Sequence, residues 1–285
     1  MRKFTNRRNA TFSAVACAFA TGALLVGIQG AAAADGSVTC TDAFAGTATN
    51  VIVPHDNGCD LSGATVTQDV IVEHDAGLFA EGLTVGHDIR LARGDFSELG
   101  GTTVGQDVTV GPGGEIHLER TTIGGSLDAL APDSVQTGGD SGGTVRIARD
   151  LTITGSPDED FIFDGLCSLD VGHDVRIVDR TVNFGIGFGD NCAGREPNTV
   201  GHDLVFTNDS AEIGFFGPSV IEVGNNTVGH DLVFTHNTAV VPGGYLEVSD
   251  NQVAGNALCE ANSPAIGSPE PQDGPNIVAG KNTCG

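Results

Sequence analysis

The chain has 285 residues, of which 37 are acidic and 13 basic, for a formal net charge of −24 at pH 7. This charge repels nucleic acid, anionic lipid surfaces and acidic polysaccharides unless a cation mediates, so we expect no nucleic-acid partner. The same acidity also keeps a long β-sheet protein soluble and discourages end-to-end association, an interpretation that needs no partner at all.

Residues 1–34 are typical of a secretory signal peptide. Arg2, Lys3, Arg7 and Arg8 precede an alanine-rich apolar run, and four alanines end it before Asp35. We favour Sec export over the twin-arginine route, because the residues after Arg7 and Arg8 fit the twin-arginine motif poorly. Cleavage leaves nine basic against 37 acidic residues, a formal charge of −28. No later apolar stretch is long enough to span a bilayer, so we expect a secreted protein, extracellular or held at the cell surface.

From residue 47 onward the sequence repeats a short phrase. Its clearest copies are residues 84–89, 199–204 and 227–232, which all read Thr-Val-Gly-His-Asp followed by Ile or Leu. We take one polar residue of each copy as the anchor of a repeat. The anchors recur with a constant spacing of 19 at first and with spacings of 24 to 29 later, at Asn50, Asp69, Asp88, Asp107, Ser126, Asp150, Asp174, Asp203, Asp231, Asn256 and Lys281.

Apolar columns flank the anchors. Three residues before the anchor every repeat has Val or Ile, except the first, which has Thr47. The positions one and three residues after the anchor are mostly apolar too, and this alternation is strand periodicity. A small residue, mostly glycine, stands two residues before the anchor, where the chain would turn a tight corner. Several repeats add an apolar pair ten and eight residues before the anchor, which predicts a third strand.

These columns predict the fold class. The shorter repeats, such as residues 69–87, have no room for a strand, a helix and two turns, and no segment after residue 35 has a helical period. We therefore predict an all-β, right-handed parallel β-helix, or β-solenoid, of about eleven rungs. It forms a single domain over residues 35–285, with slim regular rungs over residues 35–129 and wider rungs with loop excursions over residues 130–285.

Aromatic side chains gather in the wider half. We expect any binding partner, such as a cell-envelope glycan or protein, along the loops of residues 130–255, because binding residues concentrate where loops leave a rigid scaffold. The alternative is that the aromatics fill or cover a wider core. They are Phe161, Phe163, Phe184, Phe188, Phe215, Phe216 and Tyr245.

Six cysteines remain after signal cleavage, an even number that predicts disulfides in an exported chain. Cys259 and Cys284 both stand three residues after consecutive anchors, and Cys40 and Cys59 both stand ten residues before consecutive anchors. Equivalent residues of stacked rungs lie about 5 Å apart between Cα atoms, within the range of a disulfide. We predict Cys40 with Cys59, Cys259 with Cys284 and, by elimination, Cys167 with Cys192.

Three consecutive repeats carry a histidine before the anchor, as His173 with Asp174, His202 with Asp203 and His230 with Asp231. Such a ladder could hold zinc or another transition metal, because imidazole and carboxylate are its ligands. The anchor column elsewhere holds Asn50, Ser126 and Asn256, and what Asp, Asn and Ser share is the ability to accept a backbone N–H at a turn. We therefore expect turn capping and assign no metal or cofactor, with metal binding as a minor alternative.

Enzymatic interpretations of a secreted β-helix are polysaccharide lyases and glycosidases. Against the polygalacturonase pattern, this chain has Gly-His-Asp in place of Gly-His-Gly and lacks Arg-Ile-Lys. A lyase that acts on a uronate polymer needs clustered basic side chains, and those nearest to a cluster are Arg146, Arg149, Arg176 and Arg180. Carboxylates for glycoside hydrolysis could come from Asp158, Glu159, Asp160 and Asp164.

An acidic loop of this kind is usually only solvated, so we expect no catalytic residues. A polysaccharide-active enzyme or carbohydrate-binding module on a β-helix of the pectin-lyase type is the alternative function. Ice binding is a minor one, because a single column of threonines four residues before the anchors is narrow for that task. The column consists of Thr65, Thr84, Thr103 and Thr122, and Arg146 and Asp170 interrupt it.

The phrase Asn-Thr-Val-Gly-His-Asp-Leu at residues 198–204, its copy at residues 226–232 and the cysteine-containing segments 256–259 and 275–284 resemble a group of uncharacterised exported bacterial repeat proteins, chiefly actinobacterial. The resemblance implies secretion and the terminal disulfide, and it implies no activity. The chain departs from the usual Gly-Asn or Gly-Gly-Asn of that group by its Gly-His-Asp. We expect a secreted, non-catalytic solenoid that acts as a surface or extracellular structural or interaction protein.

Overall fold

The computed structural model describes residues 34–138, 143–156, 163–183, 185–189, 192, 196–214, 217–218, 220–240, 243–267 and 274–284. The predicted signal peptide, residues 1–34, lies outside this part of the chain except for its last residue. All regular elements within these ranges are β-strands. The described residues include no helix that is both long and apolar enough to cross a membrane.

The strands form three faces of a coil, two of which are joined by hydrogen bonds into one 21-stranded sheet. The first face consists of the short strands that end three residues before the anchors: β4 (Thr65–Val66), β7 (Thr84–Val85), β10 (Thr103–Val104), β13 (Thr122–Ile123), β16 (Val145–Ile147), β19 (Leu169–Val171), β23 (Asn198–Val200), β29 (Asn226–Val228), β33 (Gln252–Val253) and β35 (Ile277–Val278).

The second face consists of the strands that follow the anchors: β1 (Ala34–Thr39), β2 (Thr47–Val53), β5 (Val70–Val72), β8 (Ile89–Leu91), β11 (Val108–Val110), β14 (Leu127–Leu130), β17 (Leu151–Thr154), β20 (Val175–Val178), β24 (Leu204–Thr207), β30 (Leu232–Thr235) and β34 (Ala257–Glu260). The third face is a separate nine-stranded sheet: β3 (Gly58–Asp60), β6 (Gly77–Glu81), β9 (Phe96–Gly100), β12 (Glu115–Glu119), β15 (Ser134–Thr137), β18 (Phe163–Leu166), β22 (Gly185–Phe188), β28 (Ile221–Gly224) and β32 (Leu246–Ser249).

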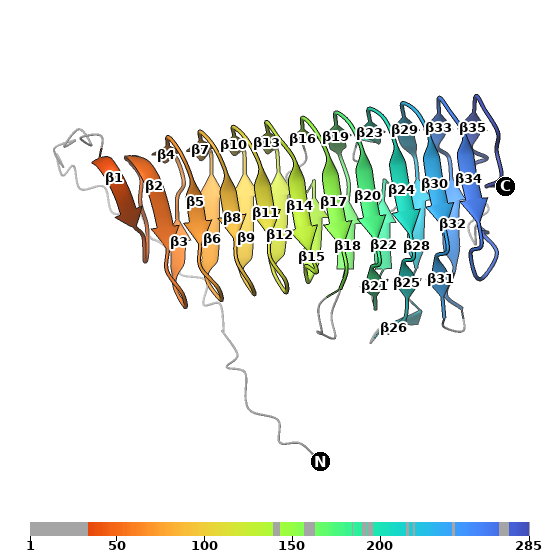
Figure 1. The fold of residues 1–285 in the computed structure, drawn as a ribbon, viewed down its shortest axis with the longest axis horizontal. Helices are drawn as coiled ribbons and strands as arrows, with labels where there is room; N and C mark the ends of the chain where they lie inside the picture. The colour runs from red at the N-terminus through yellow and green to blue at the C-terminus, as the bar shows by residue number, and fades with distance from the viewer. Residues whose placement is uncertain are drawn as a thin grey trace, which may run out of the picture. The chain divides into compact units, whose positions relative to one another are not determined.

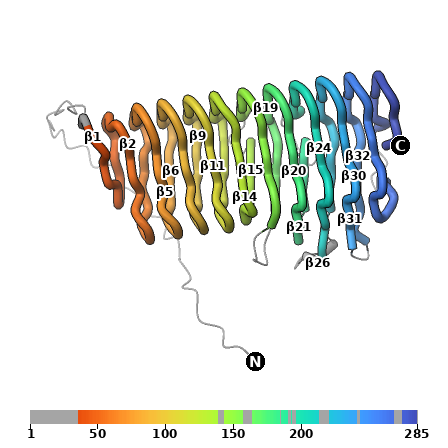
Figure 2. Tube along the Cα trace, viewed as in Figure 1, coloured from red at the N-terminus to blue at the C-terminus, as the bar shows by residue number. Residues whose placement is uncertain are grey.

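Every strand of these faces pairs in parallel with its equivalent one rung further on, which is the predicted parallel β-helix (Figure 1). The strands of the second face run downward on the side nearer to the viewer while the chain advances to the right, so the coil is right-handed. Figure 2 shows the same succession of stacked turns along the Cα trace. The wider half adds two small sheets, made of β21 (Thr181–Val182), β25 (Ser210–Ala211) and β31 (Thr238–Ala239), and of β26 (Ile213–Gly214) and β27 (Gly217–Pro218).

The valine column three residues before the anchors forms the predicted internal stack. Val66 pairs with Val85 and Val85 with Val104, and each side chain is at most 1% exposed. The first rung differs from the prediction. Thr47 was expected in this column, but Ala48 pairs with Val66 and is 1% exposed, so the chain reaches its anchor one residue sooner. The small side chain of Ala48 thus preserves the apolar column where the spacing shortens.

One further strand precedes the eleven anchored repeats. Val38 in β1 pairs with Val51, and Asn50 Nδ2 donates to Ser37 Oγ at 3.4 Å, so Ser37 takes an anchor-like position. The spacing from Ser37 to Asn50 is too short for a full rung, which is why the repeat period does not reveal it.

Most rungs use left-handed backbone at two corners, a conformation that glycine, asparagine and aspartate adopt most easily. One corner lies five or six residues after the anchor, at Asp56, Asp75, Gly94, Gly113, Ala131, Gly155, Asp179, Asn208, His236 and Ala261. The other lies six residues before the anchor, at Gly63, Gly82, Gly101, Arg120, Ser168, Asn225 and Asp250. The recurrence of Asp, Asn and Gly at these offsets is a sequence signal for the corners that the apolar columns do not contain.

The six cysteines lie in the three expected pairs, with Cα separations of 5.7 Å for Cys40 and Cys59, 5.7 Å for Cys167 and Cys192, and 4.9 Å for Cys259 and Cys284. Cys259 and Cys284 occupy equivalent positions of adjacent rungs, because Ala257 bridges to Asn282.

The expected register of Cys40 is wrong even though its partner is Cys59. Thr39 pairs with Ile52, which places Cys40 level with Val53 on the second face. Ala43 bridges to Asp60, so the position equivalent to Cys59 belongs to Asp42. The disulfide therefore crosses from the second face of the first turn to the third face of the next turn.

Candidate functional site

The anchor side chains form a hydrogen-bonded ladder that runs from rung to rung. The backbone N–H of Asp69 donates to Oδ1 of Asn50, that of Asp88 to Asp69 and that of Asp107 to Asp88, at 3.2, 3.3 and 3.0 Å. The pattern continues to the last rung, where the N–H of Lys281 donates to Asn256 Oδ1 at 3.0 Å. The predicted capping role is confirmed, and the capped N–H belongs to the next anchor instead of to the residue's own turn.

Three histidines stack on the outside of this ladder. His173, His202 and His230 each stand between a first-face and a second-face strand, in adjacent rungs. The imidazoles of His173 and His202 lie 5.0 Å apart between ring centroids with planes 3° apart, and those of His202 and His230 lie 4.6 Å apart at 6°. Their side chains are 58%, 44% and 53% exposed. We call these three residues the imidazole column.

Each ring of the imidazole column bonds to the anchor of the preceding rung. Nδ1 lies 2.8 Å from Asp150 Oδ1 in His173, 2.9 Å from Asp174 Oδ1 in His202 and 2.7 Å from Asp203 Oδ1 in His230. Because a carboxylate accepts, Nδ1 carries the proton in each pair. The ladder that supports the backbone therefore also sets the tautomer and the direction of the rings.

Hydrogen bonds between the ladder and the column shift the pKa of His173, His230 and Asp174. The hydrogen bond to Asp150 raises the pKa of His173, and the bond to Asp203 raises that of His230. Partial burial opposes ionisation of Asp174, but bonds from Arg176, from the N–H of Asp203 and from His202 outweigh it and lower the pKa of Asp174 to about 2. The carboxylate behind His202 is therefore ionised at any physiological pH.

A second histidine pair lies near the start of the coil. The rings of His55 and His74 are 3.9 Å apart between centroids, and Asp75 Oδ2 lies 3.3 Å from His74 Nδ1. His55 Nδ1 meets the backbone carbonyl of His74 at 2.9 Å, so this ring is oriented by the backbone and not by an anchor. The two histidines stand five residues after the anchors Asn50 and Asp69, at a different corner of the coil from the imidazole column.

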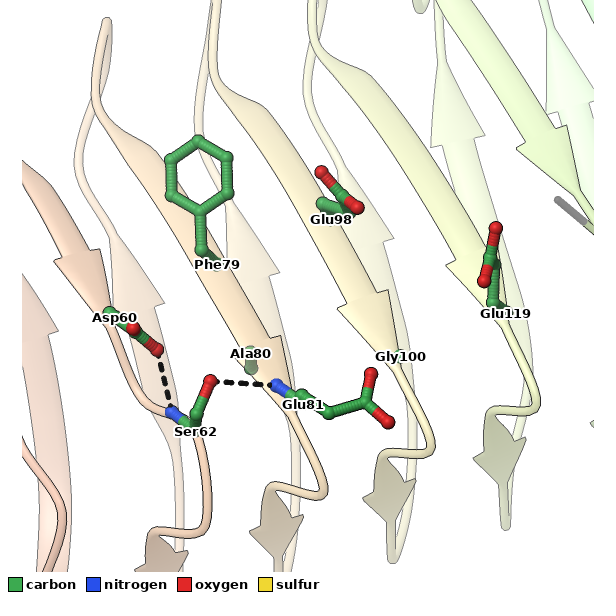
Figure 3. Close-up of a pocket in the computed structure, with 8 residues that line it drawn as sticks. All are labelled: Asp60, Ser62, Phe79, Ala80, Glu81, Glu98, Gly100 and Glu119. Carbon is green, nitrogen blue, oxygen red and sulfur yellow. Dashed lines mark hydrogen bonds between the residues drawn. The ribbon is translucent and has the colours of Figure 1, made fainter. Parts of the chain in front are cut away.

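An acidic groove lies on the third face over β3, β6, β9 and β12 (Figure 3). Phe79, which is 44% exposed, stands at one side, and the carboxylates of Glu81, Glu98 and Glu119 follow on successive strands. Ser62, which follows β3, also lines the groove, and its Oγ accepts the backbone N–H of Glu81 at 3.1 Å. We call this feature the acidic groove.

Aromatic rings continue beside the groove. Phe79 lies 5.6 Å from Phe96, and Phe96 lies 5.4 Å from His117, between ring centroids. Glu115 Oε1 is 2.9 Å from His117 Nε2. These residues belong to the slim half of the coil, whereas the sequence favoured the loops of residues 130–255. The alternation of β6 and β9 contains a signal for the groove, because Phe79 and Glu98 alternate with the buried Leu78 and Leu99 and so face outward.

The arginines considered for a lyase do not form a cluster. Arg180 is fully buried, and its guanidinium donates to Asp164 at 2.8 and 3.1 Å and to the carbonyl of Pro132. Arg176 pairs with Asp174 at 2.6 Å and Arg146 with Asp170 at 3.5 Å, both on the outside of the coil. These three side chains are thus committed to separate carboxylates, and Arg149 is exposed in the column that holds His173 one rung further on.

The candidate carboxylates for glycoside hydrolysis do not form a described site either. Asp158, Glu159 and Asp160 lie outside the described residues. Asp164 is fully buried, accepts from Arg180 and also accepts the backbone N–H of Val135 at 3.0 Å. Because Asp164 is turned into the coil, its role in the described structure is to neutralise Arg180 and to hold the third face.

Comparison of the chain with protein-family models, with curated proteins and with solved structures gave no match. The candidate sites therefore rest on the geometry of the described residues.

The aromatics of the wider half are only partly described. Phe188 is fully buried and packs edge-on against Phe206 at 5.8 Å, which supports the interpretation that they fill a wider core. The hydroxyl of Tyr245 bonds to Glu222 on the third face. Phe161, Phe184, Phe215 and Phe216 lie outside the described residues, and nothing is described for the side chain of Phe163.

Two buried asparagine ladders were not predicted from the sequence. In the first, the N–H of Asn226 donates to Asn251 Oδ1 at 3.2 Å, and that of Asn251 donates to Asn276 Oδ1 at 3.1 Å. In the second, the N–H of Asn237 donates to Asn262 Oδ1 at 2.9 Å. The sequence does contain a signal for both ladders, because these asparagines recur at a spacing of 25 residues.

Proposed function

We propose that the protein is a secreted, non-catalytic β-solenoid that acts outside the cell as a structural or interaction protein. The observation that carries the proposal is the anchor ladder, in which a side chain of each rung accepts an N–H of the next rung from Asn50 to Lys281. Such a ladder couples neighbouring rungs and makes the backbone a rigid support for the outward side chains. The outward side chains can then vary without disturbing the coil.

The disulfides support export to an oxidising compartment. Pairs at Cys40 with Cys59 and at Cys259 with Cys284 join the rungs at the two ends of the described coil, where a rung has a neighbour on one side only. Disulfides of this kind persist in extracellular and other oxidising environments and are rare in the cytosol. They support the secretion that residues 1–34 and the resemblance to exported repeat proteins lead us to expect.

Buried charges in the described coil serve its own structure. Arg180 neutralises Asp164 and reaches the carbonyl oxygens of Pro132 and Gly155, so it ties three turns together. Asp209 caps the N–H of Arg180 at 2.9 Å from inside the coil. These groups supply packing and hydrogen bonding, which supports a scaffold role.

The mature protein, residues 35–285, tests the proposal directly. A reducing-sugar assay across neutral, acidic and basic polysaccharides should show no turnover above a heat-denatured control. Release of reducing ends or of unsaturated products from any polymer would end the non-catalytic proposal.

A second candidate function is carbohydrate binding in the acidic groove. The exposed ring of Phe79 beside hydroxyl and carboxylate oxygens is an arrangement suited to the apolar face and hydroxyl groups of a neutral or basic sugar. On a glycan array, the Phe79→Ala variant should lose binding that the parent protein shows. Leu130→Ala is the matched control, because Leu130 is also an exposed apolar side chain, at 57%, but on the second face. Equal binding by parent and Phe79→Ala would contradict the groove as the sugar site.

A further inference from the structure

We propose that the imidazole column binds a divalent transition-metal ion through Nε2 of His202 and Nε2 of His230. The site is separate from the acidic groove and independent of the proposed scaffold function. Three observations carry it: the orientation of the rings, the distance between them and the charges along the column.

The direction of the rings comes from their Nδ1 bonds. His202 is held by Asp174 at 2.9 Å and His230 by Asp203 at 2.7 Å. In protein metal sites, a ligating histidine commonly donates its other ring N–H to a carboxylate, which orients the ring and raises its basicity. The described residues offer no hydrogen-bond partner to either Nε2, so both nitrogens present their lone pairs to solvent.

The distance between the rings fits a shared ion. The planes of His202 and His230 are within 6° of parallel and their centroids are 4.6 Å apart. Two nitrogens that bind one zinc ion lie at most about 4 Å apart, twice the Zn–N bond length. The lone pairs of parallel rings are themselves parallel, so the exposed Nε2 ends of the two side chains must tilt toward each other to share an ion, and water completes the coordination. His173 and His202 are further apart, at 5.0 Å.

The charges along the column also favour the His202–His230 pair. Among the described residues no arginine bonds to Asp203, because Val205 stands where Arg176 stands in the preceding rung. Arg176 holds Oδ2 of Asp174, the carboxylate behind His202, at 2.6 Å. Arg149 stands in the same column one rung before His173, because the N–H of His173 donates to the carbonyl of Arg149. One ligand atom from each of His202, Asp203 and His230 falls within 4.8 Å of the others, and His173, Asp174 and His202 meet the same condition. The difference lies in the charges: the arginine in the column stands beside His173, whereas Asp203 stands beside His230.

The chain contains its own control for this site. His87 occupies the same column in an earlier rung, is 49% exposed and lies 3.9 Å from Asp69. Its neighbours in adjacent rungs are Gln68 and Gln106, so it is a single imidazole that cannot share an ion. Glutamine is therefore a residue that this column accepts, and His→Gln substitutions in it should leave the fold intact.

The test is titration of the untagged protein with Zn²⁺ by calorimetry, in a His74→Gln background that removes the pair with His55. We expect one zinc site, at least ten-fold weaker binding in His202→Gln and in His230→Gln, and parent-like binding in His87→Gln and in His173→Gln. After His202→Gln, His173 and His230 stand two rungs, about 10 Å, apart and cannot ligate one ion. Absence of zinc binding, or unchanged binding in His202→Gln, would overturn the proposal.

Nitrogen-15 NMR of the histidine side chains identifies the ligand atoms. Zinc should shift the Nε2 resonances of His202 and His230 while Nδ1 keeps its proton. The variant Asp203→Asn tests the positioning role of the carboxylate, since asparagine occupies the same anchor column at Asn256. We expect a ten-fold or greater loss of affinity with unchanged thermal stability. Zinc shifts at His173 of the same size as at His230 would refute the choice of pair.

Discussion

The backbone N–H of Asp209 donates to Oδ1 of Asn237 at 2.9 Å, so an aspartate stands in a column of buried asparagines. Nδ2 of Asn237 donates to the carbonyl of Phe206, and Nδ2 of Asn262 does the same to Phe234. The equivalent atom of Asp209 is an oxygen, buried without a hydrogen-bond partner among the described residues. Burial and the nearby carboxylates of Asp164 and Asp179 raise the pKa of Asp209 to about 8.

A protonated Asp209 mimics asparagine, and this sets a pH dependence of stability. The folded state holds a proton that the unfolded state, with an ordinary carboxyl pKa near 4, releases. The free energy of unfolding should therefore fall between about pH 4 and pH 8, by up to about 1.4 kcal/mol per pH unit from this group. Urea unfolding of the parent and Asp209→Asn across pH 4 to 9 should show that the variant lacks this slope and is more stable than the parent at pH 9.

Asn237→Asp provides the reverse control for that prediction. It places a second carboxyl in the same buried column, where Asn237 is fully buried. We expect it to add a slope of the same sign. Parallel pH profiles for the parent, Asp209→Asn and Asn237→Asp would contradict the protonated state of Asp209.

Breaking the buried ion pair should be costly. In Arg180→Met the carboxylate of Asp164, fully buried, loses its only cationic partner among the described residues, and loss of one member of such a pair costs about 3–5 kcal/mol. Asp164→Asn keeps the Oδ1 atom that accepts from Val135. The double variant should therefore recover part of the loss in urea unfolding. A double variant less stable than Arg180→Met would show that the pair is not the origin of the cost.

Gly189 should tolerate no side chain. Its φ is 76°, and a Cβ there would lie 2.3 Å from the carbonyl oxygen of Gly224. Gly82 has a similar φ of 70° with open space around it, and Gly58 has neither restriction. Thermal unfolding of the three alanine variants should rank Gly189→Ala as least stable, then Gly82→Ala at a cost of about 1 kcal/mol, with Gly58→Ala near the parent. Equal effects at Gly189 and Gly82 would mean that the chain relaxes at the contact.

The last disulfide should hold the final rung in place. Replacing Cys259 and Cys284 by serine opens a 25-residue loop, which costs about 3 kcal/mol in the loop-entropy description. Rungs of a solenoid contact only their neighbours, so the effect should be local. Hydrogen exchange should quicken in β34 and β35 and stay unchanged in β14 and β17. Uniformly faster exchange would contradict a local staple.

The anchor ladder should be visible in histidine titrations. Hydrogen bonds to Asp150 and Asp203 raise the pKa of His173 and His230 above the usual 6.5. NMR titration should place both midpoints above 6.5, and Asp203→Asn should lower the midpoint of His230 while that of His173 changes little. An unchanged His230 midpoint in Asp203→Asn would show that the bond to Asp203 does not form in solution.

The repeat period contains enough information for the coil but not for its irregular places. Val66, Val85 and Val104 share an offset from their anchors, and parallel in-register pairing places equal offsets above one another. The period is broken at the first turn, where Ala48 replaces Thr47 in the column and Cys40 lies on a different face from the one expected. Equal offsets from the anchors do not predict the register there, because the first turn has no preceding rung of equal length to pair with.

The candidate sites also have features that the repeat period predicts and features that it does not. The sequence places His202 and His230 in one column and predicts that Asp203 accepts a backbone N–H, because both statements depend only on offset from the anchor. It does not say which nitrogen of each ring bonds to a carboxylate. That depends on the side-chain rotamers that the neighbouring rung permits.

Residue spacing alone was sufficient to predict the all-β parallel coil, its three strands per rung and the pairing of Cys259 with Cys284, because stacking converts equal offsets directly into contacts. Two other contacts became apparent only in the packed coil: Arg180 reaches back 48 residues to Pro132, and Phe79 borders a groove with Glu119. Phe79 and Glu119 stand at unequal offsets from their anchors, and the contact of Arg180 reaches two rungs back, into a turn of a different length. The geometry of both contacts depends on how the whole coil packs, and it cannot be deduced from any single column of the repeat.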